Sequence, residues 1–274
     1  MSYYIQVCSN NPDADYVVLS SGLGGHASFW KPQIELLSQY FHVLSYDQEG
    51  CHADSQYLSE NYSFKNLAQQ IFDILQQEKV SKLHFIGHAI GSFIGAELAI
   101  LCQNQSDNDA SLIEILSLTC INAWNELDPH TAKCFAARVN LLKQSGAEAY
   151  VRAQALFLYP PAWISEHHQK ITEAENLQLQ NFPPIKNVLA RIQATQLFKV
   201  NEQHRQALEN VALNFIANTD DFLVPVHKST DLMKNLGHGT LNILNSGAHA
   251  STLTETNLVN EIFIKFYQSG QFIS

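Results

Sequence analysis

The feature that most constrains the fold of this chain is an alternation of short apolar runs with amphipathic stretches of helical length. Two of those stretches, Phe64–Gln77 and Ser92–Cys102, carry apolar residues at three- and four-residue spacing, as helices packed on a sheet do. The remaining apolar runs are short enough to be buried strands. Six are predicted to be strands: Tyr16–Ser20, His42–Tyr46, Leu83–Gly87, Ile115–Ile121, Leu213–Ala217 and Thr240–Leu244. This order predicts an α/β fold in which helices flank a mostly parallel sheet.

The alternation stops in the middle of the chain. From about Trp124 to Val200 the sequence is helical in character and contains no convincing strand. We therefore expect one core, formed by residues 1–123 and 201–274, and an inserted all-helical cap formed by residues 124–200. A chain of 274 residues is long enough for one large domain with such an insertion.

Composition indicates where in the cell the protein is expected and which partners are disfavoured. Apolar residues make up 46% of the chain and charged residues only 15%, which predicts a compact folded domain. The 26 Asp and Glu against 16 Lys and Arg give a net charge of −10, which disfavours nucleic acid and anionic membranes as partners. The chain shows no signal-peptide pattern and no apolar run of roughly 20 residues, so we expect a cytoplasmic protein that does not span a membrane.

The sequence contains no signature of a metal or cofactor site. Its five cysteines are scattered without a CxxC pair, which predicts reduced thiols and neither a disulfide framework nor a zinc site. No dinucleotide fingerprint, phosphate loop or metal-ligand spacing is present. We therefore expect no cofactor and no metal.

A glycine-flanked turn follows the third predicted strand. Residues 87–91 (GHAIG) lead directly into a helical pattern and have the form of a nucleophile elbow, G-x-S-x-G, except that the central residue is Ala89. The glycines are expected because strand and helix approach closely on both sides of the strained central residue. Taken alone, the motif also fits a plain strand-to-helix turn. Ser92 starts the helix and lacks glycines two residues to either side, so it cannot replace the missing nucleophile.

Two loops upstream complete the same pattern. Residues 21–26 (SGLGGH) form a glycine-rich turn after the first strand, and together with the elbow they predict an oxyanion hole made of the Leu23 and Ile90 amides. An ordinary tight turn is the alternative. Residues 47–55 (DQEGCHADS) follow the second strand and resemble a D-x-R-G-x-G-x-S loop with Glu49 in place of arginine. We interpret this second loop as structural.

An acid and a histidine follow the last two predicted strands. Asp221, four residues before Pro225, is the expected acid, with Asp220 and a merely solvated Asp-Asp turn as alternatives. His249 follows the sixth strand and is the expected general base, which gives the chain order elbow, Asp, His. His238 precedes that strand, so it is expected at the opposite edge of the sheet.

These four loops, in this order, resemble those of the α/β-hydrolase superfamily. The cap resembles that of the RutD hydrolases of the bacterial pyrimidine-utilisation pathway, on residues 130–138 (HTAKCFAAR), residues 149–160 (AYVRAQALFLYP) and Trp163. The likeness includes residues 121–124 (INAW) and the elbow, where that family also carries alanine. The resemblance implies an α/β-hydrolase fold and a very small anionic substrate from uracil breakdown, carbamate or aminoacrylate, from which ammonia is released.

A site without a serine nucleophile restricts the chemistry. The oxyanion hole and binding alone leave about 10³- to 10⁴-fold acceleration over water, which is too little for a stable amide. It is enough for carbamate decomposition or enamine hydrolysis, because both proceed spontaneously. One positioned histidine contributes about 10²- to 10⁴-fold as general acid and base. We therefore expect Asp221 to orient His249, His249 to carry a proton, and the Leu23 and Ile90 amides to hold a carboxylate or an oxyanion.

Other residues are expected near the substrate. His88 lies beside the elbow and is expected either to add a second donor or to pack under the loop. The cap junction offers four further residues as substrate contacts or as core: Asn122, Trp124, Gln154 and Phe157.

Two other functions remain open on the sequence. One is an ordinary serine esterase or amidase, or a carbon–carbon hydrolase, in which alanine replaces the natural serine. The other is a non-catalytic, hydrolase-like binding protein. Residue types do not separate carbamate from aminoacrylate, since both are small, planar and anionic. The resemblance also allows a homodimer, although no heptad or long apolar stripe demands one.

Overall fold

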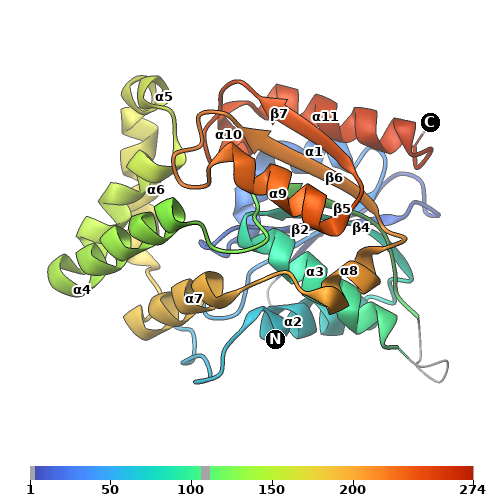
Figure 1. Ribbon diagram of the computed structural model, residues 1–274, viewed down its shortest axis with the longest axis horizontal. Coiled ribbons are helices and arrows are strands. Elements are labelled where there is room, and N and C mark those ends of the chain that lie inside the picture. The colour runs from blue at the N-terminus through green and yellow to red at the C-terminus, as the bar shows by residue number, and fades with distance from the viewer. Residues whose placement is uncertain (1–3, 106–111, 274) are drawn as a thin grey trace.

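A computed structural model describes residues 4–105 and 112–273. Its centre is a seven-stranded sheet in the order β1-β3-β2-β4-β5-β6-β7 (Figure 1). Only β1 is antiparallel to its neighbour, and every other pair is parallel. The strands are β1 (Tyr4–Val7), β2 (Tyr16–Ser20), β3 (His42–Tyr46), β4 (Lys82–His88), β5 (Glu114–Ile121), β6 (Ala212–Asn218) and β7 (Thr240–Leu244). The predicted mostly parallel α/β architecture is confirmed.

The strands differ little from those expected. β2, β3 and β7 have the predicted bounds, and β4, β5 and β6 are longer by one residue at one or both ends. β1 was not predicted, because it is a four-residue edge strand whose side chains are all only half-buried. Such a strand lacks the apolar run that marks the buried strands.

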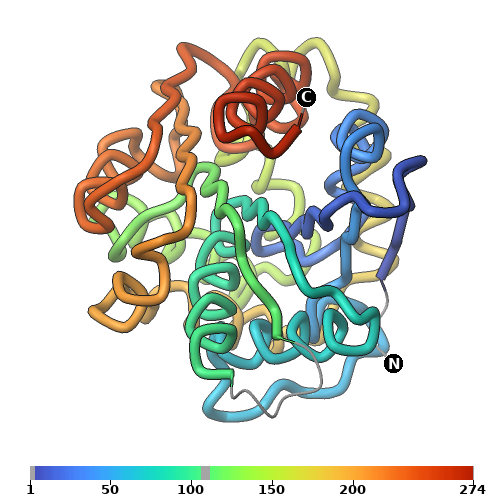
Figure 2. Tube along the Cα trace, turned by 90° about the vertical axis from the view of Figure 1, so that its right-hand side faces the viewer, coloured from blue at the N-terminus to red at the C-terminus, as the bar shows by residue number. Residues whose placement is uncertain are grey.

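Helices cover both faces of the sheet. On one face, α2 (Phe64–Gln77) and α3 (Ile90–Gln103) pack on strand residues such as Val18 and Phe85, together with α8 (Glu202–Leu208) and α9 (Val226–Leu236). The other face packs Val17 and Ile86 against α1 (Lys31–Leu37) and α11 (Thr256–Ser269). Figure 2 shows α11 on the opposite side of the strands from α2 and α3. Neighbouring strand residues therefore enter different cores, as in a sheet that is buried on both faces.

A block of helices separates β5 from β6 and lies to one side of the sheet (Figure 1). It comprises α4 (Pro129–Leu158), α5 (Pro161–Glu166), α6 (His168–Gln180) and α7 (Ile185–Leu197). α4 is interrupted at Gly146, whose φ of +87° breaks it into two helical pieces. α8 packs on α3 in the core. We therefore propose that the inserted helical cap comprises residues 124–200 and that the core resumes at residue 201.

The parallel strands bring distant loops to one edge. The turns after β2, β4, β5, β6 and β7 all leave the sheet at its carboxyl-terminal edge, where sites of this architecture form. Two short helices, η1 (Ala27–Trp30) and α10 (Ser251–Thr254), follow the first and last of these turns. Within the described residues, no helix combines the length and apolar character that crossing a bilayer requires.

Candidate active site

The turn between β4 and α3 has the backbone of a nucleophile elbow. Ala89 has φ of 49° and ψ of −113°, a strained conformation for a residue with a β-carbon. Its N–H donates to the Ile121 carbonyl at 2.8 Å, which ties the elbow to β5. A β-carbon at Gly91 would lie 2.1 Å from the Ser20 carbonyl oxygen, so α3 can start this close to β2 only with glycine there. The Ser92 hydroxyl donates to a backbone carbonyl of the elbow at 2.8 Å and is occupied in this way.

Asp221 and His249 form the polar centre of the site. Asp221 Oδ2 lies 2.8 Å from Nδ1 of His249, and both side chains are buried. Oδ1 of the same carboxylate accepts the backbone N–H groups of Leu223 and Val224, each at 2.8 Å. The fixed carboxylate therefore orients the imidazole through its Nδ1–H and leaves Nε2 as the nitrogen that can exchange a proton.

Asp220, the alternative acid, has a different place. Its carboxylate accepts the backbone N–H groups of Gly247 at 3.2 Å and Ala248 at 2.8 Å. Ala248 has a positive φ of 51°, so this backbone needs outside support. Asp220 therefore holds the loop that carries His249, while Asp221 contacts the imidazole itself.

Two further side chains hold the carbonyl of His249. Asn122 Nδ2 donates to it at 2.8 Å and reaches the Ala248 carbonyl at 3.3 Å, and His88 Nε2 donates to it at 2.8 Å. Asn122 was expected to line the substrate site. It is instead buried under the histidine loop, outside the lining of the cavity described below. The structure makes it a positioning residue for His249.

His88 is held neutral between the elbow and this loop. Burial, reinforced by the neighbouring His249, lowers the pKa of His88 to about 3. Because Nε2–H donates to a carbonyl, Nδ1 is the unprotonated nitrogen, and it has no hydrogen-bond partner among the described residues. A β-carbon at Gly22 would lie 2.8 Å from this Nδ1, which explains a glycine at that position. His88 thus presents an acceptor in place of the second donor considered from the sequence.

The amides expected to form an oxyanion hole are available. Neither the Leu23 N–H nor the Ile90 N–H donates to another described residue. Ile90 is the first residue of α3, where helical N–H groups lack intrahelical partners and favour negative charge. Both residues border the same cavity as Ala89, which is the arrangement that an oxyanion hole requires.

A cavity of about 520 Å³ lies between these loops and the helices α4 and α6. Seven of the expected residues line it: Leu23, His88, Ala89, Ile90, Trp124, Gln154 and His249. Phe157 does not; its ring packs against Phe222, with 6.1 Å between centroids. The cavity is far larger than carbamate or aminoacrylate, so polar contacts must fix the position of so small a substrate.

One charged lining residue was missed by the sequence analysis. Arg138 on α4 is 3% exposed and lines the cavity. Its Nη2 donates to the Tyr150 hydroxyl at 3.2 Å, and no carboxylate of the described chain lies within ion-pair distance. The available signal was its helical spacing from Cys134, Phe135 and Leu142, which places a cation on the buried face of the helix.

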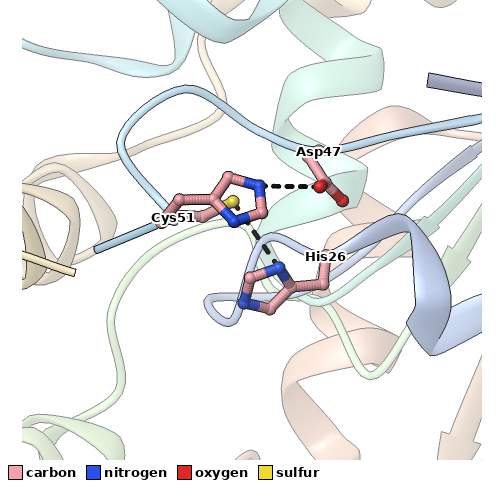
Figure 3. A group of neighbouring side chains, drawn as sticks. His26, Asp47 and Cys51 are labelled. Carbon is pink, nitrogen blue, oxygen red and sulfur yellow. Dashed lines mark hydrogen bonds and ion pairs between the residues drawn. The ribbon is translucent and has the colours of Figure 1, made fainter. Parts of the chain in front are cut away.

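The loops after β2 and β3 together hold a second group of chemically active side chains. Figure 3 shows His26, Asp47 and Cys51 turned toward one another, and His52 completes the group, in which donor atoms lie within 4.8 Å of one another. His52 Nε2 contacts Asp47 Oδ2 at 2.7 Å, and Cys51 Sγ lies 3.7 Å from His26 Nδ1. Burial lowers the pKa of His26 and raises that of Cys51 to about 12. Asp47, Cys51 and His52 lie in the loop that was interpreted as structural, and their convergence with His26 from the loop after β2 could not be seen in the sequence.

Fold and site together define the class of protein, an α/β-hydrolase whose elbow carries alanine at the nucleophile position. Residues 16–150 match the family model described as alpha/beta hydrolase fold. A protein of Acinetobacter baylyi named "Putative carbamate hydrolase RutD" is 48% identical to this chain, over 95% of it and 96% of the relative. A protein of the same name from Stutzerimonas stutzeri is 39% identical to this chain, over 92% of this chain and 91% of the relative. The chain belongs to the RutD family of α/β-hydrolases, which confirms the resemblance drawn from the cap and the elbow.

Solved structures agree on the fold. The enol-lactonase from Burkholderia xenovorans superimposes with a TM-score of 0.79 at 18% identity, covering 97% of this chain and 96% of that chain. An α/β-hydrolase from a deep-sea metagenome gives a TM-score of 0.81 at 16% identity, covering 97% and 94%. At these identities the likeness concerns the fold alone.

Proposed function

We propose that this chain is a hydrolase of uracil degradation that assists the breakdown of carbamate or aminoacrylate and releases ammonia. His249 and Asp221 act as the acid–base pair, and no serine nucleophile takes part. The proposal rests above all on the 2.8 Å contact between Asp221 and His249 beside a cavity whose elbow ends in Ala89. The names of the RutD relatives support a carbon–nitrogen bond as the target.

His249 moves the proton that either reaction needs. For carbamate, the proton goes to nitrogen as the carbon–nitrogen bond breaks, so carbamate and one proton give ammonia and carbon dioxide. For aminoacrylate, a proton adds to carbon 2, water adds to carbon 3 of the resulting iminium, and nitrogen leaves as ammonia. That reaction consumes one water and yields a three-carbon semialdehyde. In both, Asp221 stabilises the imidazolium form of His249.

The remaining parts of the site place the substrate. The Leu23 and Ile90 amides hold a carboxylate oxygen or a developing oxyanion. A methyl group at Ala89 leaves room for the attacking water or for part of the substrate where a serine hydroxyl would stand. Neither reaction needs a covalent intermediate, because both leaving steps already occur in water.

The decisive test is the rate of ammonia release with each substrate generated in solution. Wild type is expected to accelerate release, and His249→Ala is expected to lose about 10²- to 10⁴-fold of that acceleration. His238→Ala is the matched control, because His238 contacts the Leu236 and Val211 carbonyls away from the cavity. Equal rates for wild type and His249→Ala would contradict the proposal.

A second candidate is favoured by the size of the cavity. A volume of about 520 Å³ without a nucleophile also fits a non-catalytic protein that binds a carboxylic acid larger than either substrate. Thermal stabilisation by such acids, with no acceleration of ammonia release by wild type, would favour that function.

A further inference from the structure

We propose that Arg138, together with Gln154 and Trp124, forms a carboxylate-binding site on the α4 side of the cavity. The site deepens the function proposed above and rests on it for the identity of the ligand. It assigns the substrate a carboxylate that remains charged throughout the reaction.

The first argument is the unpaired charge of Arg138. An arginine that is 3% exposed is normally paired, because a buried charge without a counter-ion is costly. Here the guanidinium carbon lies 5.5 Å from the Phe135 ring centroid, 5.3 Å from Tyr150 and 5.8 Å from Phe157. These rings stabilise a cation but supply no negative charge. An anion in the cavity would complete the pairing.

The second argument is a set of unused donors. Arg138 Nε, Gln154 Nε2 and Trp124 Nε1 are all buried and have no hydrogen-bond partner in the described part of the chain. All three residues line the same cavity. Buried polar groups are nearly always paired, so several orphaned donors on one cavity indicate a ligand that accepts hydrogen bonds. This local set of donors also explains how a chain of net charge −10 attracts a small anion.

The third argument separates the two substrates. In carbamate, the carboxylate is the reacting group, and it loses its charge as carbon dioxide forms. A strong contact with Arg138 would then stabilise the substrate more than the transition state and would oppose the reaction. In aminoacrylate, the carboxylate lies two carbons from the amino group and keeps its charge from substrate to product. The Arg138 site therefore favours the enamine acid over carbamate.

The test uses two unreactive ligands of equal size, propionate and its neutral counterpart propionamide. Calorimetry on the full chain should show that wild type binds propionate more tightly than propionamide. Arg138→Met should weaken propionate binding by about 10- to 100-fold and leave propionamide unchanged. Arg138→Lys, which keeps the charge but loses the planar fork, should fall between the two.

The controls keep two failures apart. Gln154→Ala, which leaves the Arg138 packing in place, should weaken propionate binding to a smaller extent, so the result does not depend on the folding of Arg138→Met. His249→Ala should bind propionate as wild type does. If propionate and propionamide bind wild type equally, the carboxylate site is wrong, whatever the activity. If propionate is preferred but His249→Ala still releases ammonia at the wild-type rate, the proposed catalysis is wrong and the carboxylate site stands.

A different observation assigns a metal site to the loops after β2 and β3. His26, Asp47, Cys51 and His52 offer two nitrogens, one sulfur and one carboxylate oxygen within 4.8 Å of one another (Figure 3). We infer that this cluster binds Zn²⁺, which prefers four such ligands at about 2.0–2.3 Å in a tetrahedron. A tetrahedron of that size requires the two loops to draw together by about 1 Å.

The surroundings of the cluster already fix part of its geometry. Asp47 Oδ1 accepts the backbone N–H of Ala27 at 2.7 Å, which leaves Oδ2 facing His52. His52 Nδ1 lies 2.9 Å from Asn181 Nδ2, at the end of α6. With Nε2 on the metal, Nδ1 carries the proton, and the Asn181 amide must turn over to accept it. That turn gives up the hydrogen bond that Asn181 Oδ1 accepts from the Ala53 N–H at 3.2 Å. The metal would thereby connect the core to the helical segment.

Cobalt(II) reports such a site without any assay of activity. Metal-free protein titrated with Co²⁺ should bind one equivalent and develop thiolate-to-cobalt charge-transfer absorption. Cys51→Ser should abolish that absorption, and His52→Gln should weaken binding at least tenfold. Cys134→Ser is the matched control, since Cys134 is a buried thiol outside the cluster. Absence of Co²⁺ binding, or an unchanged absorption in Cys51→Ser, would overturn the assignment.

Discussion

Polar groups on the two sides of the cavity are satisfied to very different degrees. On the strand side, the Asp221 carboxylate accepts three hydrogen bonds and the His249 carbonyl accepts two. On the helical side, Arg138 has one hydroxyl partner, and the Gln154 and Trp124 donors have none within the described residues. The strand side is preorganised before any ligand arrives, whereas the helical side has donors in reserve. This difference supports the proposed division, with chemistry on the strand side and ligand recognition on the helical side.

The largest expected effect comes from the strand side. Asp221→Asn keeps the shape of the side chain but removes the charge that orients His249 and stabilises its imidazolium. We expect the acceleration of ammonia release to fall by about 10²- to 10⁴-fold. Asp220→Asn is the control, because Asp220 bonds only backbone N–H groups of the loop, and its loss should be at least tenfold smaller. Equal losses in the two variants would mean that the acid has been assigned to the wrong residue.

Asn122 and Gln154 compare the two walls directly. Asn122→Ala removes two donated hydrogen bonds under the His249 loop and should lower the free energy of unfolding by about 1–3 kcal/mol. It should also lower kcat, since the loop carries the base. Gln154→Ala removes a side chain whose Nε2 has no hydrogen-bond partner among the described residues. The free energy of unfolding should therefore change by less than about 0.5 kcal/mol. Urea unfolding measures both, and equal destabilisation would remove the contrast between the walls.

A pH-dependent loss of stability should come from His88. An unfolded histidine titrates near 6.5, whereas folded His88 has a pKa of about 3, so between these values only the unfolded chain takes up the proton. The contribution of neutral His88 to the free energy of unfolding is fully present above pH 6.5. It falls toward pH 3 by at most about 1.4 kcal/mol per pH unit. His84, with a pKa lowered to about 4 by burial, acts in the same direction.

His88→Gln isolates this contribution, since the amide can still donate to the His249 carbonyl. Between about pH 4 and pH 5.5 an unfolded histidine is almost fully protonated and folded His88 is not. Over this range, urea unfolding of His88→Gln should give a pH slope of the unfolding free energy that is smaller by nearly one proton than in wild type. His84→Gln should remove its own share and leave the His88 share in place. If His88→Gln and wild type have the same slope, His88 is not held neutral by the fold.

Features that depend on short stretches of sequence could be predicted, whereas contacts between distant segments could not. The parallel sheet could be predicted from the sequence, and the structure places Asp221 beside His249 near the elbow, because each of these depends on a local pattern and on strand order. The catalytic roles of Asp221 and His249 stay predictions. Asn122 was named but misplaced: its spacing cannot show that it turns under a loop 127 residues later. The cluster of His26 with Cys51 and His52 joins two loops. Arg138 is notable because no carboxylate of the described chain lies within ion-pair distance of it, which only the fold can show.

The smallest structural change tests the preorganised wall most directly. Ala89→Ser adds one oxygen at an elbow whose backbone already has the strained φ that a nucleophile needs. The free energy of unfolding should therefore change by less than about 0.5 kcal/mol. The new hydroxyl would stand beside His249 and the Leu23 and Ile90 amides. A fluorophosphonate should therefore label Ala89→Ser covalently, but neither wild type nor the double variant Ala89→Ser, His249→Ala. Mass spectrometry of the intact chain detects the adduct. An unlabelled Ala89→Ser would show that base and oxyanion donors are not aligned, and the strand side would then differ from the helical side in pairing but not in readiness for catalysis.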